Sequence, residues 1–339
     1  MDYYFGSYAE SEIHESMLKD RTRTEAYRDF IYHNKDYFKD KIVLDVGCGT
    51  GILSMFAAKA GAKKVFAVDN STIINKAKRI VKDNGLDQII TFVQGKVEEI
   101  SLPVEHVDII ISEWMGYFLL YEGMLDSVLH ARDRWLRPNT GLMAPSRTDI
   151  LLTAIQDEEW INDKYHFWNE VYGFNMAVMK RGFLNDGCVD HYDPDMIVAD
   201  VQTVKRIDIG STTVADLDFT SPITLTATKD ARVNGLLGWF DTFFTARDEA
   251  GNATSSPEQI EDVTFSTGPY TTPTHWKQTA FPFEHALEVR KGETISGTFE
   301  CRKHSDNHRE LTVIVDVCVR DAEGSVRDGS AVRKEYIVR

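Results

Sequence analysis

The chain has 339 residues, of which 42% are hydrophobic, and this length and composition predict two packed globular domains. Its 53 acidic residues outnumber its 38 basic residues and give a formal net charge of −15. A negative surface repels phosphate backbones, so we expect no direct nucleic-acid binding, and since no apolar run approaches the roughly 20 residues of a membrane helix, we expect no membrane association.

The first 145 residues combine helical and strand patterns. Apolar side chains at helical spacings predict a helical lid over residues 1–40. After the lid in the sequence, four predicted strands alternate with helical stretches. The strands cover Ile42–Val46, Val65–Val68, Ile89–Val93 and Val107–Ile111, and the helical stretches cover Ile52–Ala60 and the residues from a capping Ser71 to Val81. This alternation predicts the α/β fold class, with a Rossmann-like domain over residues 41–145 that binds its ligand at the carboxyl ends of the strands.

A different pattern follows Pro145, which marks a domain boundary because proline restricts its own backbone and that of the preceding residue. Short alternating strands predict a β-barrel-like domain over residues 146–339, with strands at Ile150–Ile155, Ile223–Thr228, Ile295–Glu300 and Leu311–Val319. Within it, residues 160–183 are helical in pattern and rich in aromatic side chains. These side chains either fill the core or form an arm that docks on another subunit. Residues 247–262 are interpreted as an exposed hairpin loop.

A glycine-rich turn separates the first strand from its helix. Its glycines follow Asp45 at alternate positions and allow a ligand to approach the backbone and the helix N-terminus. A dinucleotide fingerprint requires glycine or alanine where Ile52 stands, so the spacing suits S-adenosylmethionine better than NAD. We therefore expect the cofactor to contact Asp45, Gly47 and Gly49.

Acidic residues at the ends of the next two strands complete the expected cofactor site. Asp69 ends the second strand and is placed to bind ribose hydroxyls, and Glu98 follows the third strand and is placed to accept the adenine amino group. The alternative is a structural strand–turn–helix with fortuitous glycines. The position of Asp69 in register with the turn disfavours that alternative.

The loop Ser112–Met124 follows the fourth strand, where active-site loops of this architecture lie. Its two carboxylates, Glu113 and Glu122, bracket an apolar aromatic segment. A guanidinium is a planar fork of donors that stays charged, so a pair of fixed carboxylates is its natural receptor. Taken alone, the pair is equally compatible with a guanidinium site and with a chance arrangement on the surface.

Several motifs along the chain, which follow one another in the order of the family, resemble the protein arginine methyltransferases over essentially the whole chain. They lie at Tyr4–Tyr8, Ile13–Asp20, Val43–Gly51, Ser112–Met124, Phe167–Phe174 and Phe265–Thr279. The Thr-His-Trp loop in the last motif and Met17 are similar to type I members. The resemblance implies transfer of methyl groups from S-adenosylmethionine to arginine, with S-adenosylhomocysteine as the second product, giving mono- and asymmetric dimethylarginine.

Within the family, the likeness is greatest to the catalytic core of the arginine methyltransferase 3 branch, with the arginine methyltransferase 1 branch next. The run Lys19–Tyr32 and the residues Cys48 and Met55 carry this likeness. That branch has an N-terminal zinc finger and modifies a ribosomal small-subunit protein. This sequence contains no zinc finger, so the chain would correspond to the catalytic core of such a protein. We expect its substrates to contain Arg-Gly-rich segments.

The resemblance also implies roles for individual residues. Glu113 and Glu122 would hold the guanidinium, and His275, paired with Asp20, would accept the proton lost after transfer, although a lone histidine is more often structural. The remaining roles are in two groups. Arg23 and His14 would position the cofactor, and the residues that would shape the arginine slot are Tyr8, Met17, Met124 and Trp276. Glu12 and Ser16 depart from the family pattern, and we expect these departures to affect the conformation of the lid and not the chemistry.

The arm at residues 160–183 resembles the dimerisation arm of the family, which implies a head-to-tail homodimer. The four separated cysteines indicate a reducing compartment, so a cytoplasmic location is expected, with the nucleus as an alternative. The spacing of Cys301, His304 and His308 is similar to that of metal ligands but lacks a fourth ligand nearby, and we expect no metal site. Two alternatives remain: another S-adenosylmethionine enzyme, or a non-catalytic scaffold with the same fold.

Overall fold

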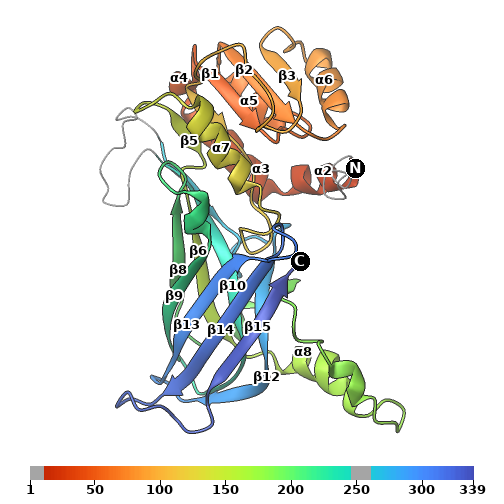
Figure 1. Ribbon diagram of the computed structural model, residues 1–339, viewed down its shortest axis with the longest axis vertical. Helices are drawn as coiled ribbons and strands as arrows, with labels where there is room; N and C mark the ends of the chain where they lie inside the picture. The colour runs from red at the N-terminus through yellow and green to blue at the C-terminus, as the bar shows by residue number, and fades with distance from the viewer. Residues whose placement is uncertain (1–10, 246–260) are drawn as a thin grey trace.

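The computed structural model describes residues 11–245 and 261–339, and it has two parts that are stacked along the long axis (Figure 1). Tyr8 and almost all of the hairpin loop at residues 247–262 lie outside the described residues. Within the part of the chain that is described, no helix is both long and apolar enough to span a membrane.

The N-terminal segment is helical, as the spacing of its apolar residues predicts. Its helices are α2 (Ser11–Lys19), α3 (Arg21–His33) and α4 (Lys35–Phe38). Asp20 caps α3 by accepting a hydrogen bond from the backbone N–H of Arg23 at 3.0 Å. Helix α3 contacts α5 of the upper part and β11 of the lower part, so it bridges the two.

The upper part is a parallel sheet of five strands in the order β3-β2-β1-β4-β5. Its strands are β1 (Ile42–Val46), β2 (Lys64–Asp69), β3 (Ile90–Gln94), β4 (Ile109–Ile111) and β5 (Leu142–Ala144), and its helices are α5 (Ile52–Lys59), α6 (Ile74–Asp83) and α7 (Leu125–Trp135). The chain winds outward in both directions from β1. In such a sheet, the crevice for a ligand opens at the carboxyl ends of the strands on either side of this switch point. The Rossmann-like fold is therefore confirmed.

Two local predictions in this sheet are wrong. Ser71 does not cap a helix, because α6 begins at Ile74 without a side-chain cap. Instead, the backbone N–H and the hydroxyl of Ser71 both donate to Oδ1 of Asp69 at 2.7 Å, since a carboxylate is the stronger acceptor. The fourth strand is also shorter than predicted, because Val107 makes only an isolated bridge to Leu136.

The lower part consists of two antiparallel sheets that close on a common core, and the predicted barrel-like domain is confirmed. The six-stranded sheet contains β6 (Arg147–Ile155), β7 (Cys188–Asp190), β8 (Gln202–Asp208), β10 (Ala231–Phe244), β11 (Val263–Ser266) and β12 (Gln278–Val289). The four-stranded sheet contains β9 (Phe219–Thr226), β13 (Thr294–Lys303), β14 (Leu311–Arg320) and β15 (Val332–Val338). The alternating apolar residues predicted on the last long strand, from Leu311 to Val319, are all buried.

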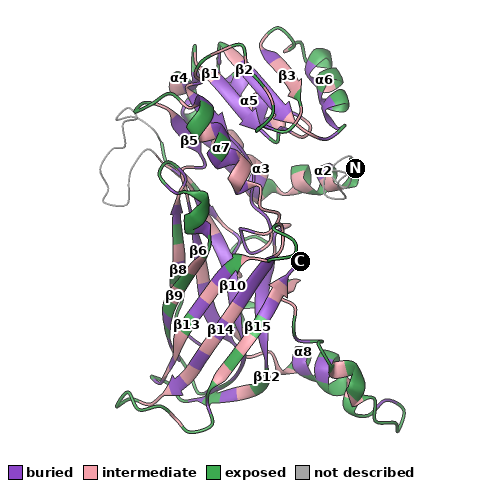
Figure 2. Cartoon of the chain, viewed as in Figure 1, coloured by how far each residue is buried: buried purple, intermediate pink, exposed green. Residues whose placement is uncertain are grey.

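The segment 158–183 projects from the barrel (Figure 1), and its helical pattern forms only short helical pieces. The pieces are α8 (Glu158–Trp160), η1 (Ile161–Tyr165), η2 (His166–Asn169) and η3 (Ala177–Lys180); two further 3-10 turns, η4 (Pro194–Met196) and η5 (Val214–Leu217), lie in the barrel. Tyr172 and Gly173 have φ of +52° and +86° and form a turn that a helix cannot contain. Tyr172 is 98% exposed and Val178 is 80% exposed, so these side chains do not fill the core. Much of the projecting segment is coloured as exposed in Figure 2.

Candidate functional site

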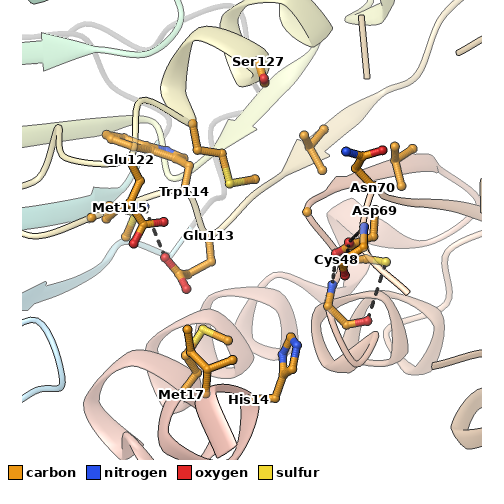
Figure 3. A pocket seen from close by; sticks show the side chains of 18 of the residues that line it. His14, Met17, Cys48, Asp69, Asn70, Glu113, Trp114, Met115, Glu122 and Ser127 are labelled. Atoms are coloured by element: carbon orange, nitrogen blue, oxygen red, sulfur yellow. Dashed lines mark hydrogen bonds between the residues drawn. The ribbon is translucent and has the colours of Figure 1, made fainter. Parts of the chain in front are cut away.

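A cavity of about 580 Å³ opens at the carboxyl ends of β1, β2 and β4. This volume is in the range of pockets that hold small molecules. Figure 3 shows Glu113, Trp114, Met115 and Glu122 on one side of it and Cys48, Asp69 and Asn70 on the other. The sequence-predicted residues that line it are His14, Met17, Arg23, Gly47, Gly49, Asp69, Glu98, Glu113, Glu122, Met124, His275 and Trp276.

The glycine-rich turn forms one wall of the cavity. Gly47 and Gly49 have φ of +73° and +51°, which is the left-handed region that favours glycine. A Cβ on Gly47 would lie 2.3 Å from Cε of Met124, and a Cβ on Gly49 would lie 3.2 Å from Cε1 of His14. The wall therefore presents bare backbone to a ligand, as the cofactor prediction requires.

Two aspartates support this turn in different ways. Asp69 lines the cavity, and its Oδ2 accepts a hydrogen bond from the backbone N–H of Gly49 at 2.9 Å. Asp45 is fully buried, is not among the residues that line the cavity, and accepts a hydrogen bond from Oγ of Ser54 at 2.6 Å. Burial raises the pKa of Asp45 to about 7, although the hydrogen bonds of Ser54 oppose this shift. The prediction that Asp45 contacts the cofactor directly is corrected: it supports the turn from the α5 side.

Glu98 lines the cavity together with Ser127 of α7, whose hydroxyl donates to the Glu98 carboxylate. No sequence pattern marks Ser127 as a site residue, because it lies in an ordinary amphipathic helix. The contact fixes the Glu98 side chain at the cavity wall.

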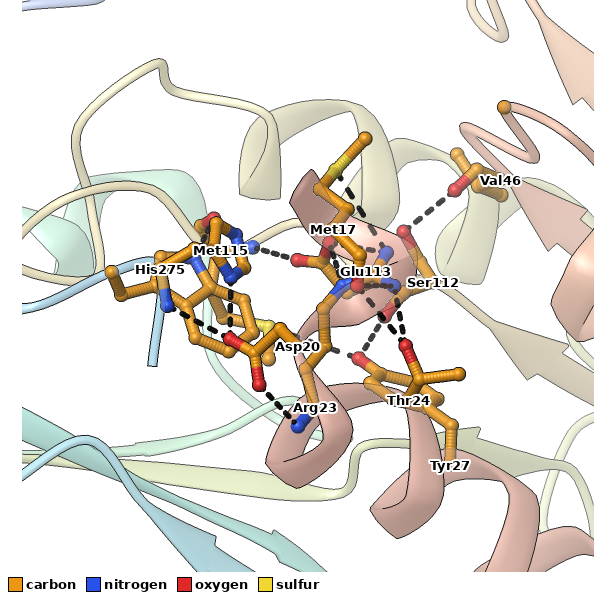
Figure 4. A network of polar contacts seen from close by, with 12 residues as sticks. Met17, Asp20, Arg23, Thr24, Tyr27, Val46, Ser112, Glu113, Met115 and His275 are labelled. Carbon is orange, nitrogen blue, oxygen red and sulfur yellow. Dashed lines mark hydrogen bonds and ion pairs between the residues drawn. The ribbon is translucent and has the colours of Figure 1, made fainter. Parts of the chain in front are cut away.

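A buried ion pair joins α3 to the loop after β4 (Figure 4). Nε and Nη2 of Arg23 lie 2.8 and 2.7 Å from Oε2 of Glu113, and each side chain is only 7% exposed. The other carboxylate oxygen, Oε1, accepts a hydrogen bond from the backbone N–H of Met115 at 3.2 Å. Nη1 of Arg23 also donates to the backbone O of Met17 at 3.3 Å. The Glu113 carboxylate is therefore held in place before any substrate binds.

Glu122 is held through its backbone. Its φ is +75°, its N–H donates to O of Arg309 at 2.7 Å, and its O accepts from Nη1 of Arg309 at 2.9 Å. Arg309 also lines the cavity, and sequence reasoning missed it. No local pattern marks it, since it lies on the turn between β13 and β14, far along the chain.

His275 and Asp20 form the predicted pair. Nδ1 of His275 lies 2.7 Å from Oδ2 of Asp20, and the backbone N–H of His275 donates to the same oxygen at 2.8 Å. Burial alone would raise the pKa of Asp20, but the hydrogen bonds from His275 and Arg23 outweigh it, and the pKa lies below its usual value. The neighbouring Trp276 donates from Nε1 to the backbone O of Met115 at 2.8 Å, which ties this loop to the Glu113 loop.

The three residues with metal-like spacing are not brought together as a site. The Cys301 side chain is fully buried in the barrel, and Nδ1 of His304 lies 2.9 Å from Oγ1 of Thr312. Over residues 11–245 and 261–339, no three His, Cys, Asp or Glu side chains are placed to bind a metal ion.

Comparison with known proteins identifies the family. Residues 146–322 match a family model described as the arginine methyltransferase oligomerization subdomain, and residues 43–139 match a methyltransferase domain. Protein arginine N-methyltransferase 1 of Chlamydomonas reinhardtii is 46% identical over 332 residues, which are 98% of this chain and 92% of that protein. The chain belongs to the protein arginine methyltransferase family. Protein arginine N-methyltransferase 1 of Schizosaccharomyces pombe is 49% identical over 312 residues, which are 92% of this chain and 88% of that protein.

Solved structures of arginine methyltransferases have the same fold. The enzyme–prozyme heterotetrameric complex of Trypanosoma brucei PRMT1 with AdoHcy matches with a TM-score of 0.89 and 42% identity over 98% of this chain and 100% of that chain. Arabidopsis thaliana protein arginine methyltransferase 10 matches with a TM-score of 0.86 and 32% identity over 99% and 100%. This arginine methyltransferase is therefore a type I, S-adenosylmethionine-dependent protein arginine N-methyltransferase.

Proposed function

We propose that S-adenosylmethionine binds along the turn at Gly47 and Gly49, between Asp69 and Glu98, and that Glu113 and Glu122 hold the target guanidinium beside it. The observation that supports this most strongly is a single cavity that contains both the bare glycine backbone and the two glutamates. When bound, the cofactor supplies a methyl group on a sulfonium. The products are mono- and asymmetric dimethylarginine.

The two carboxylates would align the guanidinium and polarise it. Transfer requires the attacking nitrogen at ~3 to 3.5 Å from the methyl carbon in a site without water. Glu113 is held by Arg23 and by the Met115 N–H, so it needs little reorganisation when the substrate arrives. The pair concentrates the positive charge of the guanidinium away from the attacking nitrogen and leaves its lone pair available. Met17, Met124 and the ring of Trp276 would form the apolar sides of the slot.

His275 is the proposed acceptor of the proton lost after transfer. The hydrogen bond from Nδ1 of His275 to the ionised Asp20 favours the tautomer in which Nε2 carries a lone pair. His275 lines the same cavity, and in this proposal Nε2 accepts the proton there. In this proposal Asp20 both orients the ring and caps the helix that carries Arg23.

Paired carboxamide variants test these roles. Glu122→Gln keeps the shape of the side chain but removes the charge, so we expect kcat with an Arg-Gly-rich peptide to fall by at least ~100-fold while affinity for S-adenosylhomocysteine is unchanged. Glu113→Gln should lower both kcat and the affinity for S-adenosylhomocysteine, because it also leaves the buried Arg23 without its anionic partner. Glu335→Gln, on the exposed surface of β15, is the matched control and should behave as wild type. Near wild-type turnover of Glu122→Gln would sink the assignment.

The branch within the family belongs to this proposal. Assignment to the arginine methyltransferase 3 branch stays a prediction, and the two relatives described above favour the arginine methyltransferase 1 branch. Proteins with Arg-Gly-rich segments are the proposed substrates in either case, with a ribosomal small-subunit protein for the first branch. Relative turnover on purified small ribosomal subunits and on an Arg-Gly-rich peptide separates the two: strong preference for the subunits supports the first branch.

A homodimer is proposed from the projecting arm at about residues 160–183. The arm presents apolar side chains to solvent, which are Phe167, Tyr172, Phe174, Met176, Val178 and Met179. Light scattering at micromolar concentration should give the mass of a dimer, and a monomer would contradict the proposal.

The proposed domain organisation is a lid at residues 1–40, followed by domains at residues 41–145 and 146–339. The four cysteines are free thiols, which supports the proposed cytoplasmic or nuclear location.

A further inference from the structure

Glu122 lies in a backbone conformation that glutamate rarely adopts. Its φ is +75°, in the left-handed region, and Gly123 follows at +68°. A Cβ on Gly123 would lie 3.2 Å from the backbone O of His308. The loop is therefore in close contact with the β13–β14 turn (residues 304–310) at the point where its conformation is least favourable.

Arg309 in the β13–β14 turn binds both backbone groups of Glu122. The N–H of Glu122 donates to O of Arg309 at 2.7 Å, and Nη1 of Arg309 donates to O of Glu122 at 2.9 Å. A bond from a charged guanidinium is stronger than a bond between neutral groups. One residue from the barrel thus fixes the peptide units on both sides of the Glu122 Cα.

The β13–β14 turn is itself well anchored. Oδ1 of Asn307 accepts from the backbone N–H of Arg309 at 3.2 Å, and Nδ2 of Asn307 donates to Oε1 of Glu310 at 2.9 Å. At the base of the turn, Lys303 forms an ion pair with Asp126 in the first turn of α7. The turn is therefore attached to the barrel on one side and to the helix that follows the Ser112–Met124 loop on the other.

We propose that Arg309 is a positioning residue for methyl transfer: by holding the backbone of Glu122, it aims the Glu122 carboxylate at the target guanidinium. This inference rests on the proposed role of Glu122. A displacement of a reacting group by ~1 Å is enough to lower a rate by ~100-fold, so the conformation of this one residue controls turnover. Figure 3 shows Glu122 on the opposite side of the cavity from Cys48, Asp69 and Asn70, so we expect Arg309 to act on the guanidinium side of the site.

Substitutions at Arg309 test the proposal. Arg309→Gln should lower kcat by at least ~tenfold without changing affinity for S-adenosylhomocysteine, and Arg309→Lys, which keeps a cationic donor, should recover part of the loss. The control is Arg302→Gln on the same hairpin, because Arg302 pairs with Glu300 at 2.8 Å and lies outside the cavity lining. Wild-type kcat in Arg309→Gln, or an equal loss of cofactor affinity, would overturn the proposal. If Arg309→Gln does not fold, Asn307→Ala replaces it under the same criteria.

A double-mutant cycle separates this inference from the function on which it rests. If Arg309 acts through Glu122, then Arg309→Gln should cause no further loss of kcat in a Glu122→Gln background. A loss as large as in the wild-type background would overturn the positioning role and leave the role of Glu122 intact. Wild-type turnover of Glu122→Gln alone would instead overturn the proposed function, and both results come from the same four proteins.

Discussion

Replacing Gly47 with alanine should lower cofactor affinity far more than a backbone effect alone explains. Gly47 has φ +73°, where an alanine costs about 1–2 kcal/mol of folding free energy. Its Cβ would also lie 2.3 Å from Cε of Met124, well inside the ~3.5 to 4.0 Å contact distance of carbon atoms, so Met124 must leave its place on the cavity wall. The added methyl group and the displaced Met124 then both disturb the proposed cofactor site.

Gly85→Ala provides the matched control. Gly85 follows α6 with φ +69°, and a Cβ built on it meets nothing within 4 Å. It carries nearly the same backbone strain as Gly47 but lies outside the cavity lining. Gly85→Ala should therefore lose about 1–2 kcal/mol of unfolding free energy, and Gly47→Ala at least as much, which urea denaturation measures.

Binding of S-adenosylhomocysteine by calorimetry separates the two variants. Gly47→Ala should raise Kd by at least ~tenfold, which corresponds to ~1.4 kcal/mol, and Gly85→Ala should leave Kd unchanged. If both variants bound the ligand as wild type does, the glycine turn would not be the cofactor wall, and this reasoning would be refuted.

Three further predictions concern parts of the chain outside the reacting groups. The pKa of Asp45 is raised from 3.8 to about 7, so the folded state keeps a proton that the unfolded state loses, and stability falls as pH rises between these values. Between about pH 5 and about pH 8, the wild type should lose roughly 3 kcal/mol of unfolding free energy through this group, and Asp45→Asn should not show this loss. Urea titrations that give the same pH dependence for both proteins would contradict the prediction. Val178→Asp should dissociate the proposed dimer in light scattering, whereas Val214→Asp, at an exposed site on the barrel, should not. Tyr27→Phe removes a buried hydroxyl that donates to O of Ser112 at 2.9 Å, and it should cost about 1–2 kcal/mol in urea unfolding; no measurable cost would count against that bond.

The features that the sequence predicts well are those with local causes. The glycine turn, the strand-end Asp69 and the loop with two glutamates each lie within a short stretch, and a parallel sheet brings the ends of its strands to one edge. The alternating residues of β14 likewise specify which face is buried. Resemblance to the family added the Asp20–His275 pair, whose partners are far apart in the chain.

The failures have physical reasons that a linear pattern does not contain. The hydroxyl of Ser71 donates a hydrogen bond to the Asp69 carboxylate, so it stabilises a turn and does not cap the helix. Asp45 follows the strand pattern of a ligand-binding residue, but its side chain is directed toward Ser54 and is buried. No linear pattern indicates Arg309, because its contact with Glu122 joins two segments far apart in the chain and depends on how the barrel packs against the sheet.

The identity of the methylated product tests the central claim most directly. Wild-type protein is incubated with labelled S-adenosylmethionine and an Arg-Gly-rich peptide, the peptide is hydrolysed, and the methylarginines are separated. A guanidinium held between Glu113 and Glu122 next to the cofactor, in a type I enzyme, should give labelled monomethylarginine and asymmetric dimethylarginine. Symmetric dimethylarginine as the only dimethylated product, or the absence of any labelled arginine, would contradict the account.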